Sequence, residues 1–181
     1  MAENLNYALS DSLRGCYEND SSNCETYGRL YTWTEAMNLD GKYSINDTNE
    51  FIQPKHQGIC PEGWHIPDNA EWSTLESYVD ALDDMDDNEG YWLKAQEGWD
   101  DKDAESEKGI DGVGFTALPS GNASTSGGFG GLGKLTGFWS ASQSCCRGDA
   151  ASNPSLLSTF SSLVFNDNYK SSRQSVRCLK D

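Results

Sequence analysis

Six cysteines among 181 residues constrain the fold of this chain more than any other feature of its sequence. The cysteines and the two histidines form no Cys-x-x-Cys or His-x-x-x-His spacing, so no zinc-binding motif accounts for them. We therefore predict a disulfide framework, which is typical of proteins that fold outside the cytoplasm. On sequence alone, six cysteines permit fifteen pairings, so the connectivity stays open at this level.

Charge and hydropathy exclude two classes of partner. The formal net charge is −16, and a surface this anionic repels nucleic-acid phosphates and anionic lipids. No apolar run approaches the ~20 residues that span a bilayer, so we expect no membrane insertion of this chain. The first residues, MAENLNYALSDS, have no signal-peptide pattern, and for an exported protein we expect the numbering to begin after a removed leader.

The segment ICPEGWHIPDNAEWSTL, residues 59–75, combines a cysteine with signals for a strand and a helix. GWHI predicts a short buried strand. Pro67 cannot extend a helix backwards, and Asp68 with Glu71 has the spacing of a capping box, so a helix is expected to begin there. It is expected to run over 68–82, with an apolar stripe of Trp72, Leu75, Val79 and Leu82.

Residues 32–39, TWTEAMNL, predict a second and shorter helix. Thr32 and Glu35 again have capping-box spacing. The apolar face of this helix consists of Trp33, Ala36 and Met37.

The remaining segments divide into expected loops and expected strands. We expect loops at 16–24, in the acidic stretch 80–107 and in the glycine-rich stretch 121–137. The expected strands are VGFTALPSG (113–121), GFWSAS (137–142), LLSTFSSLVFN (156–166) and RQSVRCLKD (173–181), with the last two forming a hairpin around NDNYKSS.

Six sequence blocks occur in the order found in the Fibrobacter succinogenes major paralogous domain family, which the chain resembles over nearly its whole length. The blocks are MAENLNYA, GCYENDSSNCETYGRLYTWTEAM, GICPEGWHIPDNAEW, GFTALPSG, GFWSAS and SVRCLKD. The resemblance implies one α+β domain over 1–181 with a C-type-lectin-like fold, distantly related to formylglycine-generating enzymes. In that fold two helices flank a small twisted antiparallel sheet, and long irregular loops emerge from one side.

The resemblance also implies two disulfides, a long-range Cys60–Cys178 bond and a local Cys16–Cys24 bond. Cys145 and Cys146 depart from the family pattern. Adjacent cysteines can form a strained vicinal disulfide, pair with cysteines elsewhere or stay free, and all three alternatives remain open.

Aromatic residues in the expected loops are candidates for sugar binding, because sugars present apolar C–H faces that stack on aromatic rings. The candidates are Trp92, Trp99 and Tyr169. Asn166 and Asp167 join them, since they stand roughly where calcium-dependent lectins carry a Trp-Asn-Asp motif, although a turn is the simpler use of FNDN (165–168). The other tryptophans are expected in the core: Trp33, Trp64, Trp72 and Trp139.

Two acidic clusters are candidates for calcium, a hard ion that binds six to eight oxygens. They comprise Asp84, Asp86 and Asn88, and then Asp100, Asp101 and Asp103. The first begins like an EF-hand loop, but Glu89 and Ala95 stand where that motif requires glycine and glutamate. Runs of charge are usually solvated, so calcium is a candidate cofactor without a motif behind it.

We expect an exported bacterial binding module rather than an enzyme, because no catalytic constellation or phosphate-binding loop is recognisable. It would sit outside the cell or on its surface, act in adhesion, and recognise a polysaccharide or a surface protein through loops at 83–112, 122–137, 141–155 and 165–171. One alternative is a structural or assembly subunit that self-associates. Another is a formylglycine-generating-type oxidase that uses Cys145 or Cys146. His65 is expected to be structural, and the RGD tripeptide at 147–149 is too short to indicate integrin binding.

Overall fold

Two helices begin where the capping boxes predict them. In the computed structural model, which describes residues 3–9, 15–82, 88–100 and 108–181, α2 spans Trp33–Ala36 and α3 spans Asn69–Asp80. Each N-cap side chain accepts a hydrogen bond from the backbone N–H three residues on, and the glutamate there accepts one from the N-cap N–H. Both predicted starts are confirmed, and both helices end earlier than expected.

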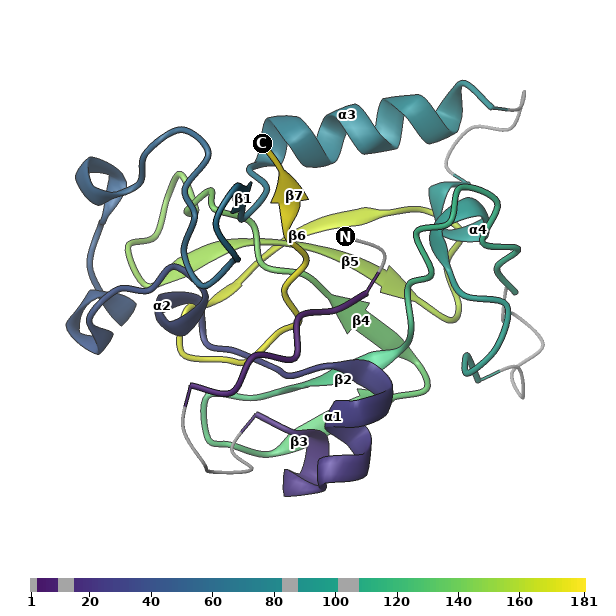
Figure 1. Ribbon diagram of the computed structural model, residues 1–181, viewed down its shortest axis with the longest axis horizontal. Helices are drawn as coiled ribbons and strands as arrows, with labels where there is room; N and C mark the ends of the chain where they lie inside the picture. The colour runs from purple at the N-terminus through teal and green to yellow at the C-terminus, as the bar shows by residue number, and fades with distance from the viewer. Residues whose placement is uncertain (1–2, 10–14, 83–87, 101–107) are drawn as a thin grey trace.

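The main sheet has five strands in the order β3-β2-β4-β5-β6 (Figure 1). The strands are β2 (Ser120–Ala123), β3 (Phe129–Leu132), β4 (Leu135–Gly137), β5 (Ala150–Leu157) and β6 (Val164–Tyr169). Neighbouring strands are antiparallel, except that β2 and β4 pair in parallel. β3 and β6 are therefore the two edges of this sheet.

A second, two-stranded sheet brings the end of the chain back to its middle. β1 (Trp64–His65) pairs with β7 (Leu179–Lys180) in antiparallel fashion. The predicted strand in GWHI is confirmed. The predicted hairpin between 156–166 and 173–181 is wrong, because β6 pairs with β5 and residues 158–163 form the turn between them.

Three stretches expected as loops contain regular structure, so these expectations are wrong in part. Residues 16–24 lead into η1 (Tyr17–Asn19) and α1 (Ser21–Tyr27), and α4 (Glu89–Leu93) lies in the acidic stretch. The glycine-rich stretch contributes to β2, β3 and β4. Glycine is what allows β2 and β3 to pair closely. A Cβ atom added at Gly121 would lie only 2.6 Å from the Gly130 oxygen, so a larger residue there would force the two strands apart.

The expected strand at 113–121 is mostly irregular. Only the bridge between Lys94 and Ala117 precedes β2 there. Two short 3-10 helices, η2 (Gly41–Ser44) and η3 (Asn49–Phe51), interrupt the segment between α2 and β1.

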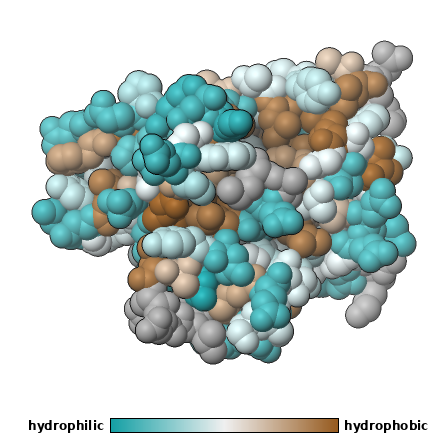
Figure 2. All heavy atoms as spheres, in the orientation of Figure 1, coloured by the Kyte–Doolittle hydropathy of each residue, from teal (hydrophilic) through white to brown (hydrophobic). Residues whose placement is uncertain are grey.

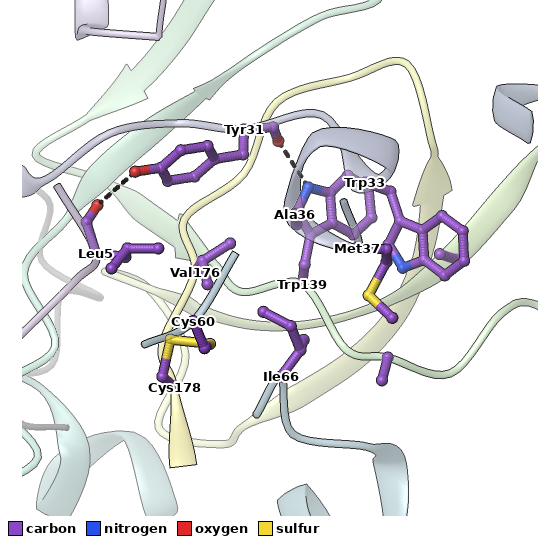
Figure 3. Close-up of a cluster of buried hydrophobic side chains, with 12 residues drawn as sticks. Leu5, Tyr31, Trp33, Ala36, Met37, Cys60, Ile66, Trp139, Val176 and Cys178 are labelled. Carbon is purple, nitrogen blue, oxygen red and sulfur yellow. Dashed lines mark hydrogen bonds between the residues drawn. A yellow bond between two sulfur atoms is a disulfide. The ribbon is translucent and has the colours of Figure 1, made fainter. Parts of the chain in front are cut away.

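One core cluster joins both ends of the described chain to its centre (Figure 3). The Trp139 indole N–H donates to the Tyr31 oxygen at 2.7 Å, and the Tyr31 hydroxyl donates to the Leu5 oxygen at 3.3 Å. Leu5 N–H in turn donates to the Val176 oxygen at 2.8 Å. Trp33 and Trp139 have no exposed surface, as expected for core tryptophans.

The second core cluster lies between α3, α4 and the main sheet. Trp72 of α3 stacks on Phe138 with ring centroids 5.5 Å apart, and Leu93 of α4 and Leu156 of β5 are fully buried in the same cluster. On the face seen in Figure 2, hydrophilic residues surround two hydrophobic groups, one around α3 and α4 at the upper right and one left of the centre. No helix in the described ranges is long and apolar enough to cross a membrane.

Two disulfides fix this arrangement. Cys16 and Cys24 are bonded across a separation of 8 residues, and Cys60 and Cys178 across 118 residues. These are the two pairs that the family resemblance implies. The Cys60–Cys178 bond lies within the first core cluster, beside Val176 and Ile66 (Figure 3).

Candidate ligand-binding site

Tyr169 is an exposed aromatic candidate that lies beside a charged pair, Arg147 and Asp149. It ends β6 and is 46% exposed. The Arg147 guanidinium lies over its ring at 4.4 Å from the centroid. Arg147 also forms two hydrogen bonds of 3.0 Å with the Asp149 carboxylate, which holds the guanidinium in one orientation.

Strand geometry decides which neighbours share this surface. Side chains alternate across a strand, so Asp167 lies on the same face of β6 as Tyr169, and Asn166 lies on the opposite face. Asp167 is exposed. The pKa of the Cys146 thiol is raised mainly by its hydrogen bond with Cys145, and the nearby Asp167 carboxylate adds a smaller effect in the same direction. We call Tyr169, Asp167, Arg147 and Asp149 the Tyr169 face.

The residue that follows Tyr169 is a buried lysine that fixes the end of β6 to two loops. Lys170 has no exposed surface, and its ammonium donates to the oxygens of Asn46 at 2.8 Å and Gly148 at 2.7 Å. The ammonium lies 4.5 Å from the centroid of the Trp33 ring. Burial lowers the pKa of Lys170, and the carboxylates of Asp47 and Asp149 oppose that shift.

Lys170 thereby ties together three segments that are distant in the sequence. The residue after β6 meets the loop at 46–48 and the loop at 143–149. The two loops also approach each other closely. A Cβ atom added at Gly148 would lie only 3.1 Å from the Asp47 backbone nitrogen, so there is little space between them. The loop at 46–48 was missed in the sequence, where Asn46, Asp47 and Thr48 show no pattern that relates them to β6.

Trp92 and Trp99 do not join this site. Both are half-buried and pack against the second core cluster. The Trp99 indole donates to the Ala117 oxygen at 2.9 Å, and the Lys94 ammonium lies 5.3 Å from its ring centroid. α4, which carries Trp92, contacts the turn before β6 through Gly90 and Ser161, whereas Tyr169 ends that strand.

The four expected recognition loops are distributed over the sheet rather than gathered. Of them, 141–155 and 165–171 meet at the Tyr169 face. The β2–β3 hairpin within 122–137 lies at the opposite edge of the sheet from β6. FNDN (165–168), for which a turn was the simpler expectation, belongs to β6 instead.

The acidic clusters give no metal site in the described residues. Asp84, Asp86, Asp101 and Asp103 lie outside those residues. Asn88 is buried beside α4, while Asp100 bonds to the Gly133 backbone and lies 3.7 Å from the Lys134 ammonium. No group of three or more His, Cys, Asp or Glu side chains in the described ranges is placed to hold a metal ion.

Cys145 and Cys146 are exposed free thiols with their sulfur atoms 2.7 Å apart. The hydrogen bond with Cys145 is the main cause that raises the pKa of the Cys146 thiol, which lowers its thiolate fraction. Arg147 and Asp149 of the RGD tripeptide are already paired with each other.

His65 has both ring nitrogens in hydrogen bonds, one with Asp181 at 2.7 Å and one with Glu71 at 2.9 Å. Its side chain is buried. This arrangement suits the structural role that the sequence predicts, because the ring links β1 to the first turn of α3 and to the residue after β7.

The family model described as the Fibrobacter succinogenes major domain matches residues 1–180. The searches of curated proteins and of solved structures gave no match.

Proposed function

Because this chain belongs to the Fibrobacter succinogenes major domain family, we propose that it is an exported, non-catalytic binding module with a C-type-lectin-like fold. Its ligand is a neutral polysaccharide, which binds at the Tyr169 face. The observation that carries this proposal is an exposed tyrosine beside an ordered guanidinium–carboxylate pair, on a strand that the buried Lys170 anchors.

Each residue of the face has a role in this proposal. The Tyr169 ring supplies an apolar platform for sugar C–H groups. Asp167 and Asp149 accept hydrogen bonds from sugar hydroxyls, and Arg147 donates to sugar oxygens. Because Arg147 and Tyr169 are already ordered against each other, little conformational entropy is lost when the ligand binds.

The charge of the whole protein favours a neutral ligand. At a formal net charge of −16, the surface repels acidic polysaccharides at low ionic strength. A neutral glycan meets no such repulsion, and stacking with hydrogen bonding is sufficient to hold it.

The test is binding to neutral glycans such as cellulose, xylan and mannan, in insoluble and soluble form, with calcium and then with a chelator. We expect Tyr169→Ala to weaken binding by about tenfold or more, which corresponds to about 1.4 kcal/mol. The matched control is Tyr78→Ala, since Tyr78 is 58% exposed on α3 and lies outside the Tyr169 face.

Equal binding by both variants would contradict the assignment of the site. Absence of binding to every glycan, in both ionic conditions, would contradict the function and favour an assembly subunit that uses the β6 edge. The chelator arm reports separately whether calcium takes part.

A further inference from the structure

The Lys170 ammonium lies against a side-chain amide. Besides its two backbone acceptors, it contacts the Gln143 amide oxygen. Gln143 belongs to the segment that precedes β5 and bridges to Ala151. The two residues are 27 positions apart in the sequence.

Both the oxygen and the nitrogen of the Gln143 side-chain amide form hydrogen bonds that polarise the group. Its oxygen accepts hydrogen bonds from the Thr48 backbone N–H at 3.0 Å and from the Thr48 hydroxyl at 2.7 Å. Its nitrogen donates to the Asp47 carboxylate at 2.9 Å. Because a backbone N–H can only donate and a carboxylate accepts, these partners fix which end of the amide is oxygen.

We propose that Lys170 and Gln143 join in an intramolecular isopeptide bond. The Lys170 nitrogen is the nucleophile, and the Gln143 carbonyl carbon is its target. The two Thr48 donors stabilise the negative charge that develops on the amide oxygen, in the manner of an oxyanion hole. The Asp47 carboxylate accepts a hydrogen bond from the departing nitrogen and acts on the charge of Lys170, so it is placed to take protons from the lysine nitrogen and pass them to the departing one.

The reaction balances without an added reactant. The lone pair of the Lys170 nitrogen forms a C–N bond to the Gln143 carbonyl carbon, and the bond from that carbon to the amide nitrogen breaks. Starting from the ammonium form, the lysine nitrogen gives up two protons, and the departing nitrogen receives two and leaves as ammonium. The product is an amide with one N–H.

The surroundings favour this chemistry at both ends. Lys170 is fully buried against the Trp33 ring, and this burial lowers its pKa, which increases the fraction of reactive neutral amine. Folding holds amine and amide in contact, which supplies the effective concentration that such a slow acyl transfer needs. Asp47 is exposed, so the departing ammonium has a path to solvent.

The test is the intact mass of the purified, reduced chain. We expect a mass below the sequence mass by one ammonia, about 17 Da. Peptide mapping should then find the Gln143 peptide covalently joined to the Lys170 peptide. This placement matters because loss of ammonia elsewhere, for example at an asparagine, gives the same mass change.

Variants separate the reacting groups from their surroundings. Lys170→Met and Gln143→Ala should restore the full mass, and Asp47→Asn should slow or prevent the loss while keeping both reacting groups. The matched control is Lys94→Met, which removes another fully buried lysine and should retain the deficit.

An intact mass equal to the sequence mass in the folded wild-type protein would overturn the proposal. So would a mass deficit of one ammonia that persists in Lys170→Met. The wild-type measurement decides even if a variant fails to fold. It involves no ligand, so its outcome is independent of glycan binding.

Discussion

At the scale of single residues, several charged side chains are buried and depend on backbone groups for their hydrogen bonds. Glu89 accepts from the Leu163 N–H at 2.7 Å, and Arg177 donates to the oxygens of Phe115 and Thr116. Arg177 also lies 4.1 Å from the Phe115 ring centroid. Desolvation of such groups couples the stability of the fold to pH.

Glu89 gives a pH-dependent prediction. Its burial is the main cause that raises its pKa from 4.5 to about 7. The native state therefore holds this proton more tightly than the unfolded state, so the Glu89 contribution to stability is fully present below pH 4.5 and is lost as pH rises through about 7. Relative to wild type, Glu89→Gln should gain on the order of 2–3 kcal/mol in the free energy of unfolding between pH 4.5 and pH 8.

Urea denaturation of both proteins at pH 4.5, 6 and 8 measures this difference. Glu25→Gln is the control, since Glu25 is exposed on α1. A Glu89→Gln difference that does not change with pH would contradict the prediction.

At the scale of elements, local signals predicted where α2 and α3 begin but not which strands pair. The starts of α2 and α3 depend on residues three positions apart, which the sequence displays directly. Strand pairing depends on distant partners, and β5 (Ala150–Leu157) carries Asn153 and Pro154 where strand-forming residues are expected. β5 nevertheless forms a strand, because it lies between β4 and β6 and hydrogen-bonds to both.

The N-cap of α3 can be tested with a matched pair of substitutions. Asp68→Ala removes the acceptor of the Glu71 N–H, now at 2.9 Å, and should lower the free energy of unfolding by about 1 kcal/mol. Asp68→Asn keeps an oxygen at the same place and should lose much less. Thermal and urea unfolding measure the two differences in free energy of unfolding. Equal losses would show that the negative charge of Asp68, rather than its hydrogen bond to the Glu71 N–H, stabilises the start of α3.

At the scale of the whole molecule, the candidate site shows where sequence reasoning stops. Tyr169 and Asp167 were recognisable as exposed, chemically suitable side chains. Lys170 was not, because a lysine in an acidic chain is expected to be solvated, and its partners at 46 and 148 become neighbours only when the fold closes. The sequence could not show that Trp92 and Trp99 are half-buried against the second core cluster, because only tertiary packing places them there.

The two disulfides should differ in their effect on global stability. In the loop-entropy model the Cys60–Cys178 bond contributes about 5 kcal/mol, and the Cys16–Cys24 bond about 2.5 kcal/mol. We expect the double variant Cys60→Ala/Cys178→Ala to lose roughly twice as much free energy of unfolding as Cys16→Ala/Cys24→Ala. Urea titration of both under oxidising conditions makes the comparison, and a larger loss for the local pair would contradict the entropic explanation.

The pairing of residues 174–180 with Leu5, Tyr31 and β1 has a consequence for how the chain is made. A ribosome adds these residues after the segments with which they pair, so a nascent chain cannot close either the first core cluster or the Cys60–Cys178 bond before residues 174–180 are made. Contacts of such long sequence separation also form slowly. We therefore expect a nascent chain that stops before residue 174 to remain open, and the first core cluster and the Cys60–Cys178 bond to form only after residues 174–180 have been added.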